Sequence, residues 1–177
     1  SMYHCQTKIY LIGQQGQIFM PLMKAMPPLT GFSHDFWQTD LPDNSLISQA
    51  NLILADWQSL PDGFSQKNQP QQQTILLTTK EELAELNSQT DLSQFADIWF
   101  LHLEETELRL RFAAWQRSWK QTMDLQETKH FLDAAINGSP NLIWFKTKDG
   151  IHEIVNDSFC QTVNKTKDDV QGRGHAY

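Results

Sequence analysis

Short apolar runs alternate with segments of helical spacing along residues 1–103. The apolar runs are near-continuous, with few polar residues inside them, which is typical of strands buried on both faces of a parallel sheet. The expected strands are residues 8–12, 32–38, 52–55, 74–78 and 96–103. The helices expected between them are residues 18–26, 41–50 and 81–86.

Proline, glutamine-rich and capping residues mark where the expected helices and loops begin and end. Pro21 falls in the first turn of the first expected helix, where its missing N–H costs little. The polar, Gln-rich stretch 59–73 offers almost nothing to bury, so we expect a surface loop or a frayed helix there. Candidate caps precede the second helix: Asp43, Asn44 and Ser45. Together the elements predict an α/β fold, a flavodoxin-like doubly wound sheet of five parallel strands.

A long helix is expected after the last strand, because residues 104–137 contain no proline and no glycine. Such a helix spans about 50 Å, more than one domain needs. Apolar side chains recur on it with heptad-like spacing: Leu108, Phe112, Trp115, Trp119 and Met123. They can pack on the predicted sheet, form the seam of a parallel dimer, or do both in succession. Since exposed tryptophans are costly, we expect a homodimer with this coiled-coil seam.

The last part of the chain has the order helix, apolar run, turn, apolar run and two short helical segments. This order resembles the opening of a PAS sensor domain, over about a quarter of the chain. The residues that match the PAS motif are Pro140, Lys146, Asp149, Gly150, Asn156 and Phe159. The resemblance implies a sensing and relay role, and it covers roughly the first half of a PAS domain. We therefore expect the chain to be a piece of a longer signalling protein.

The segment NLILADWQSLPDG resembles the phosphoacceptor region of a response-regulator receiver domain, with Asp56 at the strand end. The resemblance implies Mg²⁺ held by that aspartate and by an acidic pair after the first strand. Here the pair is replaced by Gln14 and Gln15, and Pro61 lies one residue further from Asp56 than usual. Thr78 or Thr79 matches the receiver hydroxyl. His102 stands where receivers carry a lysine. We interpret Asp56, Thr78, Gln14 and Gln15 as a vestigial phosphoacceptor region, with Asp56 a structural residue.

Other candidate sites have weaker support. Gly13-Gln-Gln-Gly16 has too few glycines, at the wrong spacing, for a dinucleotide-binding turn. The six histidines do not fall at metal-ligand spacing, so no metal or other cofactor is expected. His130 lacks the acidic neighbour of a kinase phosphoacceptor histidine, and Cys160 reads as a small buried residue. No arrangement typical of an enzyme stands out.

Composition narrows the possible partners and compartment. Lys and Arg number 14 against 21 Asp and Glu, and the net charge of −7 argues against a nucleic-acid partner. No apolar run is long enough to span a membrane, and no signal peptide opens the chain. The 2 cysteines are far apart in sequence, which suits a reducing cytoplasm.

The sequence therefore predicts three parts. These are a receiver-like domain at 2–103, a signalling helix at 104–130 and the N-terminal part of a PAS domain at 131–177. The resemblances imply a non-enzymatic input and relay segment of a bacterial signal-transduction protein related to two-component systems. Its downstream output domain is expected to be a diguanylate cyclase of the GGDEF type. The alternatives are the sensory part of a histidine kinase, an α/β domain that still binds a phosphate or nucleotide, and a dimerisation scaffold.

Overall fold

The computed structural model describes residues 4–60, 64, 70–86, 91–138, 144–146, 148, 152–155, 160, 161, 163 and 167. The chain forms two compact units, Ser1–Met123 and Asp124–Tyr177. The strands of the first unit are β1 (Cys5–Ile12), β2 (Phe32–Thr39), β3 (Leu52–Asp56), β4 (Gln73–Thr78) and β5 (Asp97–Phe100). Its helices are α1 (Gln14–Ala25), α2 (Asn44–Gln49), α3 (Lys80–Glu85) and the first part of α4 (Glu105–Asn137).

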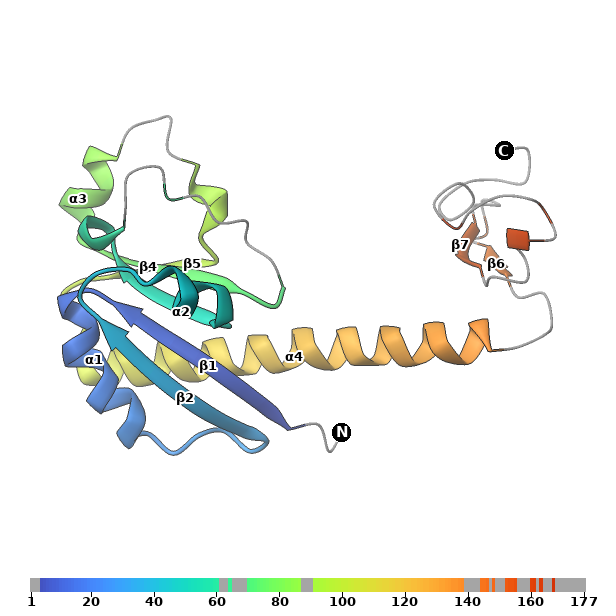
Figure 1. The fold of residues 1–177 in the computed structure, drawn as a ribbon, viewed down its shortest axis with the longest axis horizontal. Helices are drawn as coiled ribbons and strands as arrows, with labels where there is room; N and C mark the ends of the chain where they lie inside the picture. The colour runs from blue at the N-terminus through green and yellow to red at the C-terminus, as the bar shows by residue number, and fades with distance from the viewer. Residues whose placement is uncertain are drawn as a thin grey trace. The chain divides into compact units, whose positions relative to one another are not determined.

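The sheet of the first unit has the order β2-β1-β3-β4-β5, and every neighbouring pair is parallel (Figure 1). This confirms the prediction of an α/β fold with five parallel strands, in the order of flavodoxin-like folds. The carboxyl ends of β1 and β3 lie side by side. Of the helices, α1 and α4 pack on one face of the sheet and α2 packs on the other.

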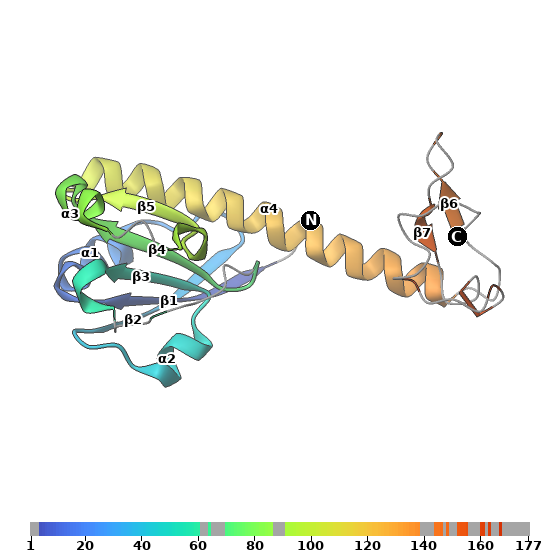
Figure 2. The same cartoon turned by 90° about the horizontal axis from the view of Figure 1, so that it is seen from above.

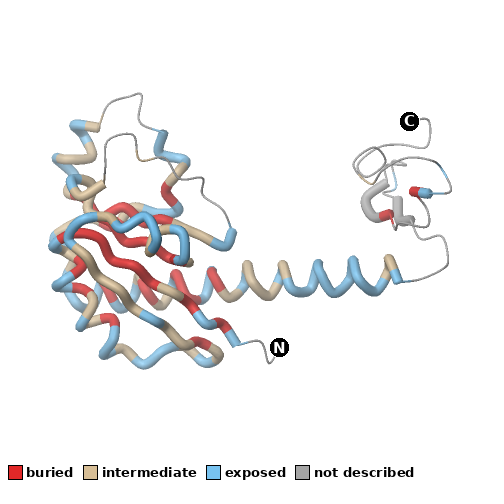
Figure 3. Tube along the Cα trace, viewed as in Figure 1, coloured by how far each residue is buried: buried red, intermediate tan, exposed pale blue. Residues whose placement is uncertain are grey.

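Helices lie on both faces of the sheet (Figure 2), and alternate residues of the central strands β1 and β3 pack into different core clusters. On β1, Ile9 and Leu11 pack with side chains of α1 and α4, whereas Tyr10 and Ile12 pack with side chains of α2. The buried strand residues form the red centre of Figure 3. The sheet is thus covered on both faces, as its near-continuous apolar strands predict.

The first helix differs from the prediction. It begins at Gln14, directly after Gly13, so Pro21 lies inside the helix and not in its first turn. The prediction was wrong because residues 14–17 are mostly polar and show no apolar periodicity, although they form the first turn. Pro21 cannot donate to the carbonyl of Gln17, but Gln17 is exposed and water can satisfy that carbonyl.

Two further boundaries follow from pairing and capping. β5 ends at Phe100, earlier than predicted, because its partner β4 ends at Thr78, which pairs with Phe100. Asp43 is the residue that caps α2, since its side chain accepts the N–H groups of Ser45 and Leu46. The predicted cap region is therefore confirmed.

The first part of α4 belongs to the core of the first unit. The helix side chains that pack against the sheet and α1 are Leu108, Phe112, Trp115, Trp119 and, at the margin, Met123. These are the five residues assigned to a dimer seam, and the structure places them in the intramolecular arrangement. Because the chain's own sheet already covers these side chains, they do not present a seam to a second chain. Whether the chain dimerises stays a prediction.

The buried side-chain amide of Gln116 fixes α4 against the edge strand β2 and the loop before it. The Oε1 atom of Gln116 accepts the backbone N–H of Leu29 at 3.2 Å and the Nε2–H of His34 at 3.1 Å. The imidazole of His34 lies 5.2 Å from the ring of Phe112, measured between centroids. Burial lowers the pKa of His34, and its hydrogen bond to Gln116 opposes that shift. A neutral imidazole is therefore the form that suits this apolar contact.

The second unit contains the last part of α4 and an antiparallel hairpin, β6 (Trp144–Lys146) and β7 (His152–Val155). The two strands fall in the two apolar runs that the sequence analysis placed on either side of a turn, and Phe145 lies opposite Ile154. Lys146 belongs to β6. The other residues of the predicted PAS motif lie outside the described residues: Pro140, Asp149, Gly150, Asn156 and Phe159. Within the described part of the chain, no helix has both the length and the apolar character needed to span a membrane.

Candidate functional site at the strand ends

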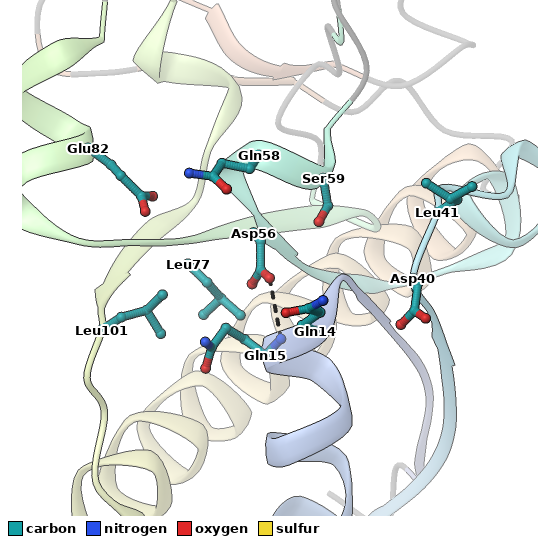
Figure 4. A pocket seen from close by; sticks show the side chains of 10 residues that line it. All are labelled: Gln14, Gln15, Asp40, Leu41, Asp56, Gln58, Ser59, Leu77, Glu82 and Leu101. Carbon is teal, nitrogen blue, oxygen red and sulfur yellow. Dashed lines mark hydrogen bonds between the residues drawn. The ribbon is translucent and has the colours of Figure 1, made fainter.

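A cavity of about 460 Å³ opens at the carboxyl ends of the sheet strands (Figure 4). Open α/β sheets bind their ligands at such ends, beside the point where the strand order reverses. In this sheet that point lies between β1 and β3. The residues that line the cavity are Gln14, Gln15, Asp40, Leu41, Asp56, Gln58, Ser59, Leu77, Glu82 and Leu101.

Asp56 ends β3 and ties it to the start of α1. Its Oδ2 atom accepts the backbone N–H of Gln15 at 3.3 Å, whereas its Oδ1 atom is buried without a hydrogen bond to the described residues. Burial raises the pKa of Asp56, and the carboxylate of Glu82 raises it further. The backbone N–H groups of Gln15 and Gln14 act in the opposite direction. The carboxyl group therefore works mainly as a hydrogen-bond acceptor for the first turn of α1.

Gly13 allows the close approach of β3 to this turn. Its φ of 102° and ψ of 179° fall in a region that is essentially restricted to glycine. A Cβ atom at this position would lie 2.5 Å from Oγ of Ser59 and 2.6 Å from Oδ2 of Asp56. An acidic side chain cannot occupy position 13 without moving both neighbours. Position 13 therefore cannot supply a carboxylate ligand for Mg²⁺: glycine has no side chain, and there is no space for an acidic one.

The predicted residues meet only in part. Gln14, Gln15 and Asp56 line the same cavity, and Figure 4 shows both glutamines at the start of α1 beneath Asp56. Thr78 is buried and is not among the lining residues, but its hydroxyl donates to Oε2 of the lining residue Glu82 at 3.1 Å. That contact supports the start of α3. Lys80, the first residue of α3, is also not a lining residue, and its Nζ atom lies 5.8 Å from the ring centroid of Phe100.

Several polar lining residues were not among the predicted site residues. Asp40 follows β2, and its Oδ1 atom accepts the side-chain amides of Gln17 at 2.6 Å and Gln38 at 3.2 Å. Ser59 lies in a short 3₁₀ helix after β3, and Glu82 lies in the first turn of α3. Strand-end position could have suggested Asp40. Ser59 lies in a connection whose path the apolar pattern does not specify, whereas Glu82 lies in a helix that was predicted but was not linked to the site.

The lining of the cavity is acidic. Asp40, Asp56 and Glu82 contribute carboxyl groups, and among the described residues no lysine or arginine lines the cavity. A phosphate would meet like charge here, with glutamine amides and the first N–H groups of α1 as its nearest donors. Among the residues that the structure describes, no three His, Cys, Asp or Glu side chains are placed to hold a metal ion. The geometry fits a cross-link between β3 and α1 better than a phosphoryl site.

Replacing Asp56 with asparagine is expected to raise the free energy of unfolding at neutral pH. The folded-state pKa of Asp56 is raised above 3.8, so ionisation costs stability as pH rises through that folded pKa. Asparagine keeps the acceptor oxygen for Gln15 and removes the charge. In urea titrations, the difference from wild type should shrink as pH falls toward 3.8. The exposed Asp35→Asn serves as control, and a destabilised Asp56→Asn at neutral pH would contradict the assignment.

Comparison with models of known protein families gave no match to this chain. A search of curated proteins found no similar sequence either. The interpretation of the strand-end cavity therefore depends on its residues and their geometry alone.

Proposed function

We propose that this chain is a regulatory input and relay segment of a signal-transduction protein. Its receiver-like domain is not phosphorylated and is coupled through α4 to a PAS sensor domain. The observation that carries the proposal is the packing around Asp56, where Gly13 leaves no space for a further side chain and the backbone N–H of Gln15 binds one carboxylate oxygen. Asp56 keeps the place of a phosphoacceptor at the end of β3 but serves the fold.

The anchoring of α4 supports a relay role. The helix begins in the core of the first unit and continues without interruption into the second unit, over 33 residues. Its first part is held by buried aromatic side chains and by the hydrogen bonds of Gln116. A rearrangement of the sheet or of the loop at Leu29 would therefore move the helix that leads to the second unit. A helix transmits such a displacement because its backbone hydrogen bonds keep it stiff.

The sensory and output parts of the proposal come from the sequence resemblances. The β6–β7 hairpin is compatible with the first strands of a PAS sheet. On this proposal the chain is bacterial and cytoplasmic and has no enzymatic activity of its own. It acts upstream of an output domain, a GGDEF diguanylate cyclase in the first place and a histidine kinase as the alternative. Its partners are a second copy of the chain and that output domain.

A phosphate- or nucleotide-binding role is the second candidate from the sequence. The cavity offers the N-terminus of α1 as an anion-binding feature, but Asp40, Asp56 and Glu82 line the same space. Their charges oppose a phosphate, so the relay role is favoured.

Incubation with acetyl phosphate and Mg²⁺ tests the proposal. We expect the intact protein to keep its mass, because Gln14 and Gln15 supply neither the charge nor the affinity that Mg²⁺ needs. Phosphorylation of Asp56 would contradict it.

A further inference from the structure

The last part of α4, residues 124–137, exposes apolar side chains. Every residue from 127 to 135 is exposed. Three large apolar side chains keep much of their surface in water: Leu125 at 70%, Phe131 at 68% and Leu132 at 52%. Figure 3 shows this stretch in pale blue, in contrast to the buried start of the same helix. A helix face of this composition is expected to find a partner.

The spacing of these residues matches a coiled-coil seam. Leu125 and Leu132 are one heptad apart, and Thr128 and Ala135 occupy the positions between and after them. With Leu125 and Leu132 at the a positions, Thr128 and Ala135 are the d positions. The small side chains at d allow close approach, and residues 124–137 supply two heptads, about 21 Å of helix.

The flanking positions favour a second copy in parallel register. In such a dimer a g residue faces the e residue five positions further along the other chain. That relation pairs Asp124 with Lys129, which carry opposite charges. It also pairs Phe131 with Ile136, which are both apolar. One register therefore matches charge with charge and apolar side chain with apolar side chain.

We propose that this face, made of Leu125, Thr128, Leu132 and Ala135, binds the same face of a second copy of the chain. The helices run parallel and in register. This inference extends the proposed function, because a relay helix that pairs with its copy transmits a displacement as a change of the dimer. It also moves the dimer contact away from the side chains that the sheet already covers.

Light scattering coupled to size exclusion tests the dimer over a range of protein concentrations. We expect the wild-type mass to approach twice that of one chain as concentration rises. Leu132→Glu should give the mass of one chain at every concentration, because two glutamates would meet at the seam. The matched control Ala134→Glu places the same charge at an exposed position away from the seam and should leave the dimer intact.

A charge swap tests the register. Lys129→Asp should weaken the dimer by placing two acidic side chains together, and Asp124→Lys combined with Lys129→Asp should restore it. A monomeric wild type at all concentrations would overturn the inference. A dimer that Leu132→Glu leaves intact, with helical content unchanged by circular dichroism, would also overturn it. Both results are independent of phosphoryl transfer to Asp56, so this dimer contact and the proposal that Asp56 is not phosphorylated fail separately.

Discussion

Trp119→Glu is expected to unfold the first unit. Trp119 is 4% exposed and stacks on Trp115, with ring centroids 5.3 Å apart. Removing a buried tryptophan side chain costs about 3–5 kcal/mol. A glutamate there also buries an unpaired charge, at a further cost of several kcal/mol. Since small domains are stable by only about 5–15 kcal/mol, the loss approaches the whole free energy of unfolding.

The same experiment decides whether Trp115 and Trp119 pack on the chain's own sheet or form a dimer seam. Urea titration followed by near-UV circular dichroism should show Trp119→Glu unfolded or close to unfolding in buffer. The matched control Leu110→Glu changes a side chain that is 67% exposed on the same helix, and it should shift stability by less than about 0.5 kcal/mol. If Trp119→Glu kept the wild-type unfolding midpoint and only changed the oligomeric state, the side chain would lie in a dimer seam.

Gly13→Asp is the second substitution with a large expected effect. The backbone conformation of Gly13 costs other residues about 1–3 kcal/mol. The new Cβ atom would also press on Ser59 and Asp56, and such overpacking typically costs about 1–3 kcal/mol. We therefore expect the free energy of unfolding to fall by about 2–6 kcal/mol. Chemical denaturation at neutral pH measures this loss.

Gln14→Asp is the control for Gly13→Asp. It adds the same acid one residue later, on an exposed side chain in the first turn of α1. Negative charge is favourable at a helix N-terminus and the carboxylates that line the cavity oppose it, so this variant should be about as stable as the wild type. Equal stability of Gly13→Asp and Gln14→Asp would show that position 13 has room for a side chain and would remove the steric argument for a vestigial site.

The apolar pattern predicted the elements of the first unit well but not all their ends. Near-continuous runs such as Leu52–Asp56 identify buried strands because both faces of a parallel sheet are covered. The start of α1 was missed because Gln14, Gln15 and Gln17 are held by a turn at Gly13 that apolar periodicity does not register. The end of β5 depends on the length of its neighbour β4, which is a tertiary property.

The apolar side chains of α4 show why sequence spacing alone could not distinguish packing on the sheet from pairing with a second copy of the chain. Leu108, Phe112 and Trp115 repeat at spacings that fit both the 3.6-residue period of a helix face and the 3.5-residue period of a coiled coil. Over so few turns the two periods barely diverge. Only the burial of these side chains in the core of the first unit settles their location.

Three of the residues that line the cavity were predicted from the sequence, and the other polar lining residues were not. Asp56 ends β3, Gln14 and Gln15 begin the helix after β1, and parallel strand ends meet at one edge of the sheet. Ser59 lies in the connection after β3, and Glu82 lies in α3. How close these two elements come to Asp56 depends on tertiary packing. The positive φ of Gly13 was also hidden, although it decides which side chains can stand beside Asp56.

Intact-mass spectrometry after incubation with acetyl phosphate and Mg²⁺ tests the central claim, that Asp56 is a structural acceptor and not a phosphoacceptor. The account predicts one unmodified mass for the wild type, identical to that of the protein incubated without the phosphodonor. Asp56→Asn should behave in the same way. A wild-type adduct with the mass of one phosphoryl group, absent from Asp56→Asn, would contradict the account.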